Sequence, residues 1–261
     1  TTIQAIENGL DFIEKEHNVR ILFASDAGSH AWGWAQTGSD YDIRFIYVHH
    51  IDWYLAIEEG RRDVIDHVPQ NENAEFHGWD LKKTLKMLKE RNPGLLEWLR
   101  SPSVFRKDEQ LTNMLLSLSA QFASARQVIF HFINIAKKHQ RDYFDDRTSI
   151  IPKKYFYVLR PLLSIVHMEQ RNLHLPPVHF PTLLSELTWK EDETDAKNTL
   201  LQLLESKQKG QLPSESAKME VLDKWILKLF EYAAVYVKTV PFGDEPPVNI
   251  FNELCANTIK R

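Results

Sequence analysis

Cysteine is almost absent from this sequence, and long apolar runs are absent altogether. Cys255 is the only cysteine among 261 residues, so the chain cannot build a disulfide framework or a zinc knuckle of its own. A membrane-spanning helix needs about 20 consecutive apolar residues, and no segment approaches that length. The first residues also lack the basic-then-apolar pattern of a signal peptide. We therefore expect a cytoplasmic protein with no membrane partner.

A large excess of basic residues is also missing. Lysine and arginine number 32 against 36 aspartates and glutamates, which gives a formal net charge of −4. Such a balance argues against a dominant surface for non-specific binding of nucleic acid, although it leaves room for a local basic groove. The hydrophobic content of 43% is ordinary for a globular chain with one large domain or two smaller ones.

The strongest pattern lies between residues 21 and 48. An apolar run typical of a strand breaks at Gly28 and Ser29, and strand-like sequence resumes after a loop, with Asp40 and Asp42 at its start. Side chains two residues apart on a strand point to the same face, so these two carboxylates are expected side by side.

This arrangement suits a divalent cation and a phosphate. Mg²⁺ takes oxygen ligands from one or two carboxylates and completes its shell with water and substrate phosphate. Glycine lets the backbone approach a ligand closely, and amide groups at a turn or helix start can hold a phosphate. The pattern predicts that Asp40 and Asp42 bind metal and that Gly28 and Ser29 bind a nucleotide phosphate.

A Gly-Ser turn followed by Asp-x-Asp on a strand resembles the nucleotidyltransferases of the DNA polymerase β superfamily. The resemblance extends to a bacterial family of predicted nucleotidyltransferases grouped with the RNA repair pathway polymerase β family. The segments that carry it are DYDIRFIYV at 40–48, DWY at 52–54, RDVI at 62–65, GWDL at 78–81, NP at 92–93, LEWL at 96–99, SP at 101–102 and KKYFYVLRPLL at 153–163.

The resemblance implies an α+β fold in two domains. Residues 1–105 would form the nucleotidyltransferase domain, a mixed sheet with flanking helices, and residues 106–261 an α-helical domain closing over the nucleotide site. Helical periodicity in 110–140, 154–173, 192–208 and 216–238 agrees with the second part. The strand signals lie before residue 92, including a third strand expected at 62–68.

The same resemblance implies a reaction. A nucleoside monophosphate would pass from a nucleoside triphosphate, by the superfamily's habit ATP, to an acceptor hydroxyl, with two Mg²⁺ ions and pyrophosphate as the leaving group. An RNA end, a protein side chain and a small molecule are all compatible acceptors.

Polymerase β-like enzymes add a third carboxylate from a neighbouring strand. Glu75 is the better placed candidate, because it is expected on the last strand before a helix carrying Leu81, Leu85 and Leu88 on one face. Asp80 is the alternative, and it could instead cap that helix.

Lys153, Lys154, Tyr157 and Arg160 lie in the C-terminal matching segment. The resemblance favours a clamp for the nucleotide triphosphate, since lysine and arginine can neutralise departing pyrophosphate. The alternative is a solvated basic patch beside core aromatic residues.

Two departures from the family pattern concern the turn. His30 stands where the family has arginine in Gly-Ser-Arg. The pair before the glycine, an acidic residue and serine in the family, is Asp26-Ala27 here. The missing arginine could weaken nucleotide binding, which motivates a second hypothesis: an inactive nucleotide-binding or antitoxin-like module. Both aspartates of the metal pair are retained, and this favours the enzyme.

Two further observations have alternative explanations. Arg126 and His131 have a spacing reminiscent of helical RNases, which is a weaker hypothesis than a core histidine. Trp32, Trp34 and Trp79 could stack on a base, although core packing is the usual role of such residues.

Overall fold

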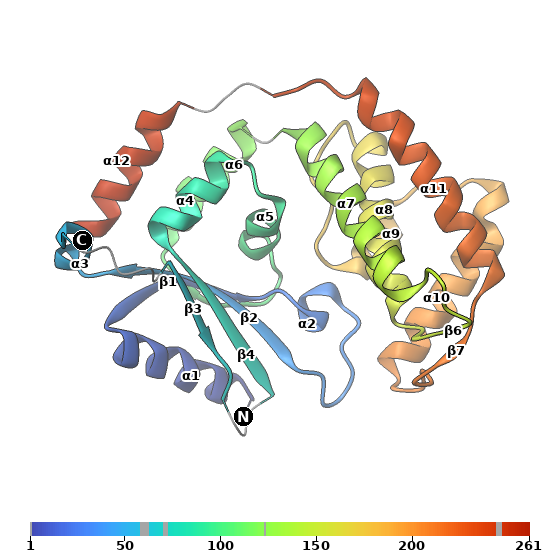
Figure 1. Cartoon of the computed structure of the whole chain (residues 1–261), viewed down its shortest axis with the longest axis horizontal. Coiled ribbons are helices and arrows are strands. Elements are labelled where there is room, and N and C mark those ends of the chain that lie inside the picture. The colour runs from blue at the N-terminus through green and yellow to red at the C-terminus, as the bar shows by residue number, and fades with distance from the viewer. Residues whose placement is uncertain (1, 58–62, 70–72, 123, 244–246) are drawn as a thin grey trace. The chain divides into compact units, whose positions relative to one another are not determined.

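The computed structural model describes residues 2–57, 63–69, 73–122, 124–243 and 247–261 (Figure 1). The chain divides into two compact units, each described here by itself. The first, which we call the α+β unit, comprises Thr1–Ala31, Gly38–Ala123 and Asp244–Arg261. The second, which we call the helical unit, comprises Trp32–Thr37 and Ser124–Gly243.

The α+β unit is built on a mixed five-stranded sheet with the strand order β3-β4-β2-β1-β5. β2 and β4 are parallel, and the other neighbouring strands are antiparallel. This confirms the expected α+β class with a mixed sheet. Its elements are α1 (Thr2–His17), β1 (Val19–Asp26), α2 (Ser29–Trp32), β2 (Tyr41–His49), α3 (Ile51–Leu55), β3 (Val64–His67), β4 (Ala74–Asp80), α4 (Leu81–Lys89), α5 (Pro93–Leu99), β5 (Val104–Lys107), α6 (Glu109–Phe122) and α12 (Val248–Ile259).

Helix α1 covers one face of this sheet. Its apolar residues recur every three or four positions, and Ile6, Leu10 and Ile13 are completely buried. They belong to one core cluster with Ile43 and Phe45 of β2. Because side chains alternate along a strand, the intervening residues of β2 project from the opposite face. The acidic start of β2 therefore has one face in the core and one face available for chemistry.

Helices α4 and α5 lie on the other side of the sheet (Figure 1). α4 buries Leu81, Leu85 and Leu88, as the helical spacing predicted. The ring of Trp98 in α5 lies 4.1 Å from that of Trp79 in β4, measured between centroids. Tryptophan burial supplies a large apolar area, so this pair attaches α5 to the face of β4 that α1 does not cover.

Strand β5 was not expected from the sequence. It is short, its residues are only partly buried, and it pairs with β1 at the edge of the sheet. Arg106 holds it against α1 by donating hydrogen bonds to Glu7 (3.0 Å), Asp11 and Glu14 (3.0 Å). Long-range charge pairing, which local periodicity does not report, accounts for this strand. The third expected strand, 62–68, is observed as Val64–His67; residue 62 lies outside the described residues.

The unit boundaries differ from the expected boundary at residue 105. α6 contacts α4 and α5, and α12 contacts α4, so both helices group with the α+β unit. In turn, residues 32–37 group with the helical unit although they lie early in the chain. Packing between segments far apart in the sequence causes both differences. The apolar-periodic stretch 110–140 is two helices, because α7 starts afresh at a cap formed by Ser124.

The helical unit carries five α-helices among its described residues, with one short 3₁₀ turn and one two-stranded ribbon. Its elements are α7 (Ala125–Tyr143), β6 (Ser149–Ile150), α8 (Lys154–Gln170), α9 (Phe180–Glu186), η1 (Glu191–Glu193), α10 (Thr194–Gln208), β7 (Ser216–Ala217) and α11 (Glu220–Thr239). α8 is the central helix, since it contacts α7, α9 and α11 and is buried along most of its length. Within the described parts of the chain, no helix is long and apolar enough to cross a bilayer.

Replacement of Arg106 tests the attachment of β5. Arg106→Leu leaves three carboxylates of α1 without their common cation, and we expect a loss of roughly 1–3 kcal/mol in the free energy of unfolding. Urea unfolding measures this loss. Lys107→Leu is the matched control, since Lys107 forms an exposed ion pair with Glu109 on the neighbouring helix α6. Equal stability of the two variants would show that the arginine network contributes nothing.

Candidate functional site

The turn after β1 is organised by the buried carboxylate of Asp26. Its Oδ2 accepts hydrogen bonds from the backbone N–H groups of Gly28 (3.1 Å) and Ala31 (2.7 Å). Its Oδ1 accepts from the backbone N–H of Asp42 (2.9 Å). Asp26 thus caps the short helix α2, which begins at Ser29, and joins the Gly-Ser turn to the acidic strand.

Gly28 lies directly against the carboxylate of Asp42. A β-carbon added at Gly28 would lie 1.9 Å from Asp42 Oδ2, so only glycine fits between the turn and this side chain. The backbone N–H of Ala27 also donates to the carbonyl oxygen of Asp42 (2.9 Å). The structure therefore brings Gly28 against Asp42, with Ser29 following in the same turn.

The acidic residues lie at the entry to β2 and on its neighbour β4. Asp40 is exposed just before β2, and Asp42 is the second residue of the strand. Glu75 is the register partner of Asp42 in the parallel β2–β4 pair, so their side chains project from the same face. Glu75 is exposed. Arg44, two residues after Asp42 on β2, forms an ion pair with Asp42 at 3.6 Å.

Asp80 has a different role. It is 2% exposed, and its Oδ1 accepts from the backbone N–H of Lys82 (2.7 Å) at the start of α4. Its Oδ2 accepts from the Tyr54 hydroxyl (2.5 Å). Both oxygens are therefore engaged in holding α4 and α3 in place. Of the two candidates for the third carboxylate, the geometry favours Glu75.

The electrostatics of Asp42 reflect this crowding of carboxylates. Burial raises the pKa of Asp42 above the usual aspartate value, the nearby Arg44 lowers it, and the charges of Asp26 and Asp40 raise it again. The net direction is upward. A positive ion beside Asp42 would favour its charged form and offset this effect.

His30 is held in the same turn. Its Nε2 lies 3.0 Å from the carbonyl oxygen of Ser39, and its ring stacks on Tyr41 at 3.8 Å between centroids. His30 is close enough for its charge to lower the pKa of Asp42. The imidazole therefore links the turn to the segment that precedes Asp40, although it lacks the five donors of an arginine.

The acidic set has the chemistry that Mg²⁺ requires. Among the described residues, no three His, Cys, Asp or Glu side chains are already grouped as a metal cage. Mg²⁺ does not need one, since it is commonly bound by one or two carboxylates with water and substrate phosphates. Asp40 and Asp42 offer hard oxygen ligands of this kind, and the charge of Asp40 acts on Asp42, whereas Glu75 is related to Asp42 by strand register.

The four expected clamp residues lie at the start of α8 in the helical unit. The Lys154 ammonium lies over the rings of Tyr143 (3.8 Å) and Tyr157 (4.6 Å). The Arg160 guanidinium is 9% exposed and lies 4.6 Å from the centre of the Trp32 ring. Lys153 is exposed and is the N-cap residue of the same helix. The structure thus places these cations on one helix with aromatic neighbours.

Arg126 has structural contacts. Its Nη1 donates to the carbonyl oxygen of Val240 (3.2 Å), and its guanidinium lies 4.1 Å from the ring of Phe242. These contacts attach the start of α7 to the segment after α11. They give no support to the RNase hypothesis based on Arg126 and His131.

The three tryptophans have packing contacts. Trp34 is 2% exposed and stacks on Phe156 at 5.2 Å, and Trp32 contacts Trp34 at 5.1 Å. Trp79 packs on Trp98, as described above. Of the three, Trp34 is the clearest core residue.

Sequence reasoning missed the roles of Asp26 and Arg44. An aspartate two residues before Gly28 typically accepts hydrogen bonds from backbone N–H groups at a turn or helix start. That signal could have found it. Arg44 lies two residues after Asp42 on a strand, and the same alternation that paired the aspartates could have indicated the ion pair.

Three comparisons relate this chain to known proteins. The sequence model of the RNA repair pathway DNA polymerase beta family matches residues 2–257. An uncharacterized protein of Bacillus subtilis (strain 168), YcgL, is 35% identical over 257 residues, which cover 98% of this chain and 96% of that protein. A crystal structure of a nucleotidyltransferase-like protein from Exiguobacterium sibiricum 255-15 aligns with a TM-score of 0.35 and 11% identity, over 90% of this chain and 75% of that one.

Substitution of Asp26 tests its role in the turn. Asp26→Asn replaces one accepting oxygen by an NH₂ group that faces a backbone donor, so we expect a loss of about 1–3 kcal/mol in unfolding free energy. Chemical denaturation measures it. Asp40→Asn, at an exposed position, serves as the control and should change stability little. An unaltered Asp26→Asn protein would show that its hydrogen bonds do not organise the turn.

The raised pKa of Asp42 predicts that its negative charge lowers the stability of the fold near neutral pH. The folded protein favours protonated Asp42, so this residue supports folding below the ordinary aspartate pKa and loses that contribution as the pH rises through its raised pKa. Asparagine stays neutral. Without metal, Asp42→Asn should therefore melt at a higher temperature than the wild type near neutral pH, with the advantage disappearing in acid. Thermal melts at both pH values measure it, and a variant less stable at neutral pH would contradict the prediction.

Proposed function

We propose that this chain, which belongs to the RNA repair pathway DNA polymerase beta family, transfers a nucleoside monophosphate from a nucleoside triphosphate to an acceptor hydroxyl. The observation that supports this most directly is the contact between Gly28 and the Asp42 carboxylate, with Asp26 fixing both backbones. A turn able to hold phosphate and a carboxylate able to hold metal are thereby adjacent.

The turn would bind the nucleotide through its backbone. Gly28 has no side chain to block close approach, and Ser29, which is half-buried, begins α2. Asp26 holds this backbone in position before a ligand arrives, so little ordering is required on binding. We assign Gly28, Ser29 and His30 to the nucleotide phosphates.

Asp40, Asp42 and Glu75 would hold Mg²⁺, two ions by analogy with the family. When bound, the metal polarises phosphate oxygens and promotes attack by the acceptor oxygen. Arg44 already neutralises part of the charge on Asp42 and keeps its carboxylate oriented. Pre-orientation of a ligand by such a partner is common at metal sites.

The reaction exchanges one phosphorus–oxygen bond for another. The acceptor oxygen forms a bond to the α-phosphorus, the bond to the β-phosphate oxygen breaks, and pyrophosphate leaves with both bonding electrons. The acceptor's hydroxyl proton needs a base. Glu75 is exposed and has no hydrogen-bond or ion-pair partner in the described part of the chain, so we assign it this role in addition to metal binding.

Within the helical unit, we assign the cations of α8 to phosphate groups. Arg160 is largely buried and held against Trp32, so its guanidinium is pre-oriented. Lys154, beside Tyr157, is a more flexible point charge. ATP is the proposed triphosphate. An RNA end is the acceptor we favour, because the family is described by an RNA repair pathway.

Calorimetric titration with ATP tests this function. Wild type should bind ATP in a Mg²⁺-dependent manner, and an Asp40→Asn, Asp42→Asn double variant should lose the metal-dependent part, because it lacks two of the three proposed metal ligands. Binding should also weaken as the pH falls through the raised pKa of Asp42, whose protonated form cannot hold metal. The other triphosphates are titrated in parallel.

Two single variants separate the acids. Glu75→Gln should lower transfer of labelled nucleotide to RNA by roughly 100-fold or more if it serves as the base, with little effect on stability. Asp80→Asn should mainly destabilise the fold, since it weakens the cap of α4.

No triphosphate binding by the wild type would overturn the proposal. Binding without transfer to any acceptor would instead support an inactive nucleotide-binding module.

A further inference from the structure

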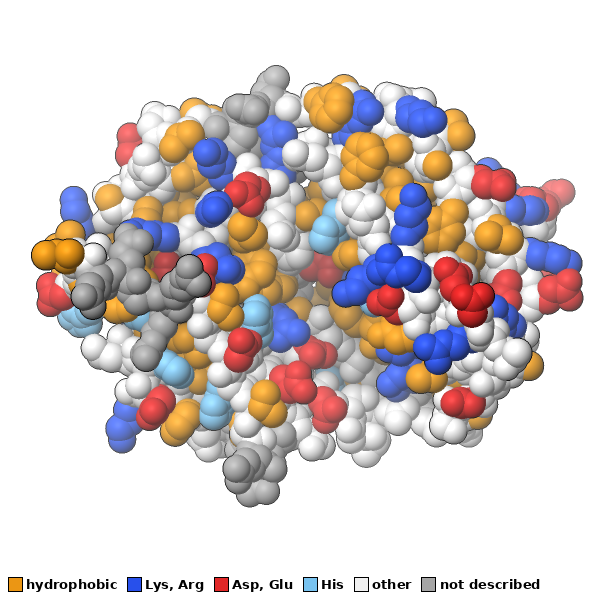
Figure 2. All heavy atoms as spheres, viewed as in Figure 1, with side chains coloured by type: hydrophobic (Ala, Val, Ile, Leu, Met, Phe, Trp, Pro, Cys, Tyr) orange, Lys and Arg blue, Asp and Glu red, His pale blue; other side chains and the backbone are white. Residues whose placement is uncertain are grey.

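A strip of cations follows one face of α8 within the helical unit. Lys153, Tyr157 and Arg160 are spaced by four and three residues, so they share a helix face. Trp32 contacts this face at both Tyr157 (5.9 Å between ring centroids) and Arg160. On the face seen in Figure 2, over the part of the helical unit where α7 runs in Figure 1, Lys and Arg side chains lie beside Asp and Glu side chains.

Lys207, from the end of α10, lies close enough to Lys153 for the charge of Lys153 to act on it. It is 9% exposed, and its Nζ donates to the side-chain oxygen of Gln36 (2.9 Å). The next residue, Gln208, donates from Nε2 to the carbonyl oxygen of Gly33 (2.8 Å). The last turn of α10 therefore holds the loop that follows α2 through two side chains, one neutral and one charged.

Among the described residues, the charge of Lys207 is not paired with a carboxylate. In the described chain, no carboxylate forms an ion pair with Lys207 or Lys153. Burial lowers the pKa of Lys207, and the nearby positive charge of Lys153 lowers it further. Burying an ammonium group beside another one is unfavourable unless something compensates it.

Attachment of the loop does not explain this charge. Gln208 shows that a neutral donor is sufficient to hold the same loop, and a neutral side chain at 207 would avoid the cost of burying a charge. Trp32, which ends α2 and contacts the same face of α8, has an Nε1 donor that is also buried, with no acceptor among the described residues. The strip thus has an excess of positive charge and of hydrogen-bond donors.

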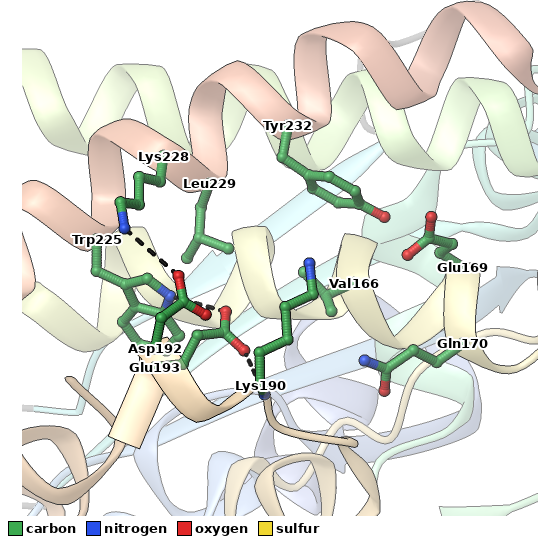
Figure 3. Close-up of a pocket in the computed structure, with 10 residues that line it drawn as sticks. All are labelled: Val166, Glu169, Gln170, Lys190, Asp192, Glu193, Trp225, Lys228, Leu229 and Tyr232. Atoms are coloured by element: carbon green, nitrogen blue, oxygen red, sulfur yellow. Dashed lines mark hydrogen bonds and ion pairs between the residues drawn. The ribbon is translucent and has the colours of Figure 1, made fainter. Parts of the chain in front are cut away.

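Another hollow in the helical unit has the opposite character (Figure 3). It has a volume of about 140 Å³, and three carboxylates outnumber two lysines in its lining. Its acids are partly engaged: Glu193 accepts from Trp225 Nε1 (3.1 Å) and the backbone N–H of Lys190 (3.0 Å), and Asp192 pairs with Lys228 at 3.6 Å. Lys207 is therefore a better binding position for an anion than this acidic pocket.

We propose that Lys207, together with Lys153, binds a phosphate group at a subsite separate from that of Arg160. Arg160 lies seven positions after Lys153, a rise of about 10 Å along the helix. This inference rests on the proposed function. The phosphate could belong to the end of the nucleotide triphosphate or to the backbone of an RNA acceptor, and both would be recognised by the same charge-assisted hydrogen bonds.

The test compares three variants. Lys207→Gln removes the charge, Lys207→Arg retains it, and Lys209→Gln is the control, because Lys209 is exposed and pairs with Glu205 at 2.5 Å in the same part of the chain. Calorimetry measures the binding of ATP, of inorganic pyrophosphate without metal, and of a short single-stranded RNA. Thermal melts report any loss of folding.

Lys207→Gln should weaken binding about 10-fold or more, whereas Lys207→Arg and Lys209→Gln should stay near the wild type. Weaker binding of ATP and pyrophosphate would assign the subsite to the triphosphate. Weaker binding of RNA alone, with a salt dependence reduced by about one phosphate contact, would assign it to the acceptor.

The inference is overturned if Lys207→Gln binds all three probes as Lys209→Gln does, or if Lys207→Arg fails to restore binding. A lower melting temperature with unchanged binding would leave Lys207 as a structural attachment only. The pyrophosphate titration without metal does not need the acidic residues of the α+β unit. Failure of the proposed function would instead appear as the absence of metal-dependent ATP binding in the wild type.

Discussion

The candidate site depends on one buried carboxylate. Asp26 accepts hydrogen bonds from the backbone of Gly28, Ala31 and Asp42, and so fixes the turn and the acidic strand in a single unit. A carboxylate that accepts several N–H bonds in a buried place is difficult to replace, because each donor left without a partner is costly. The position of the proposed metal ligand relative to the proposed phosphate-binding turn follows from this arrangement. The functional chemistry is therefore placed by a residue that need not take part in it.

The same arrangement concentrates negative charge. Asp42 lies near Asp26 and Asp40 and beside a strand that carries Glu75, and burial raises its pKa, while Arg44 offsets only part of the effect. A fold selected only for stability would avoid such a group, and a divalent cation would relieve it. In the helical unit the imbalance has the opposite sign. There the positive charge of Lys153 acts on the largely buried Lys207, an arrangement that suits a phosphate group. A ligand of opposite charge would offset the cost of burial at Asp42 and at Lys207.

Much of the fold was predictable from local patterns. The apolar spacing of α1 and α4, the alternation in β2 and the motif order indicated the α+β class and the family, and both were confirmed. Strand β5 and the grouping of α6 and α12 were not predictable, because an arginine network and contacts between distant helices decide them. The choice between Glu75 and Asp80 also stayed open at that stage. Only strand register and the cap of α4 give a reason to favour Glu75.

The sequence by itself determined the candidate chemistry: a glycine-serine turn, an aspartate pair on one strand face, and a later segment rich in lysine, arginine and tyrosine. These features involve residues a few positions apart, and helix or strand geometry alone relates them. The tertiary structure decided which distant groups join them. It gave Asp26 its three backbone partners, set Glu75 opposite Asp42, and brought Lys207 to the start of α8. Those relations depend on register and on packing between segments far apart in the chain, which no local periodicity encodes.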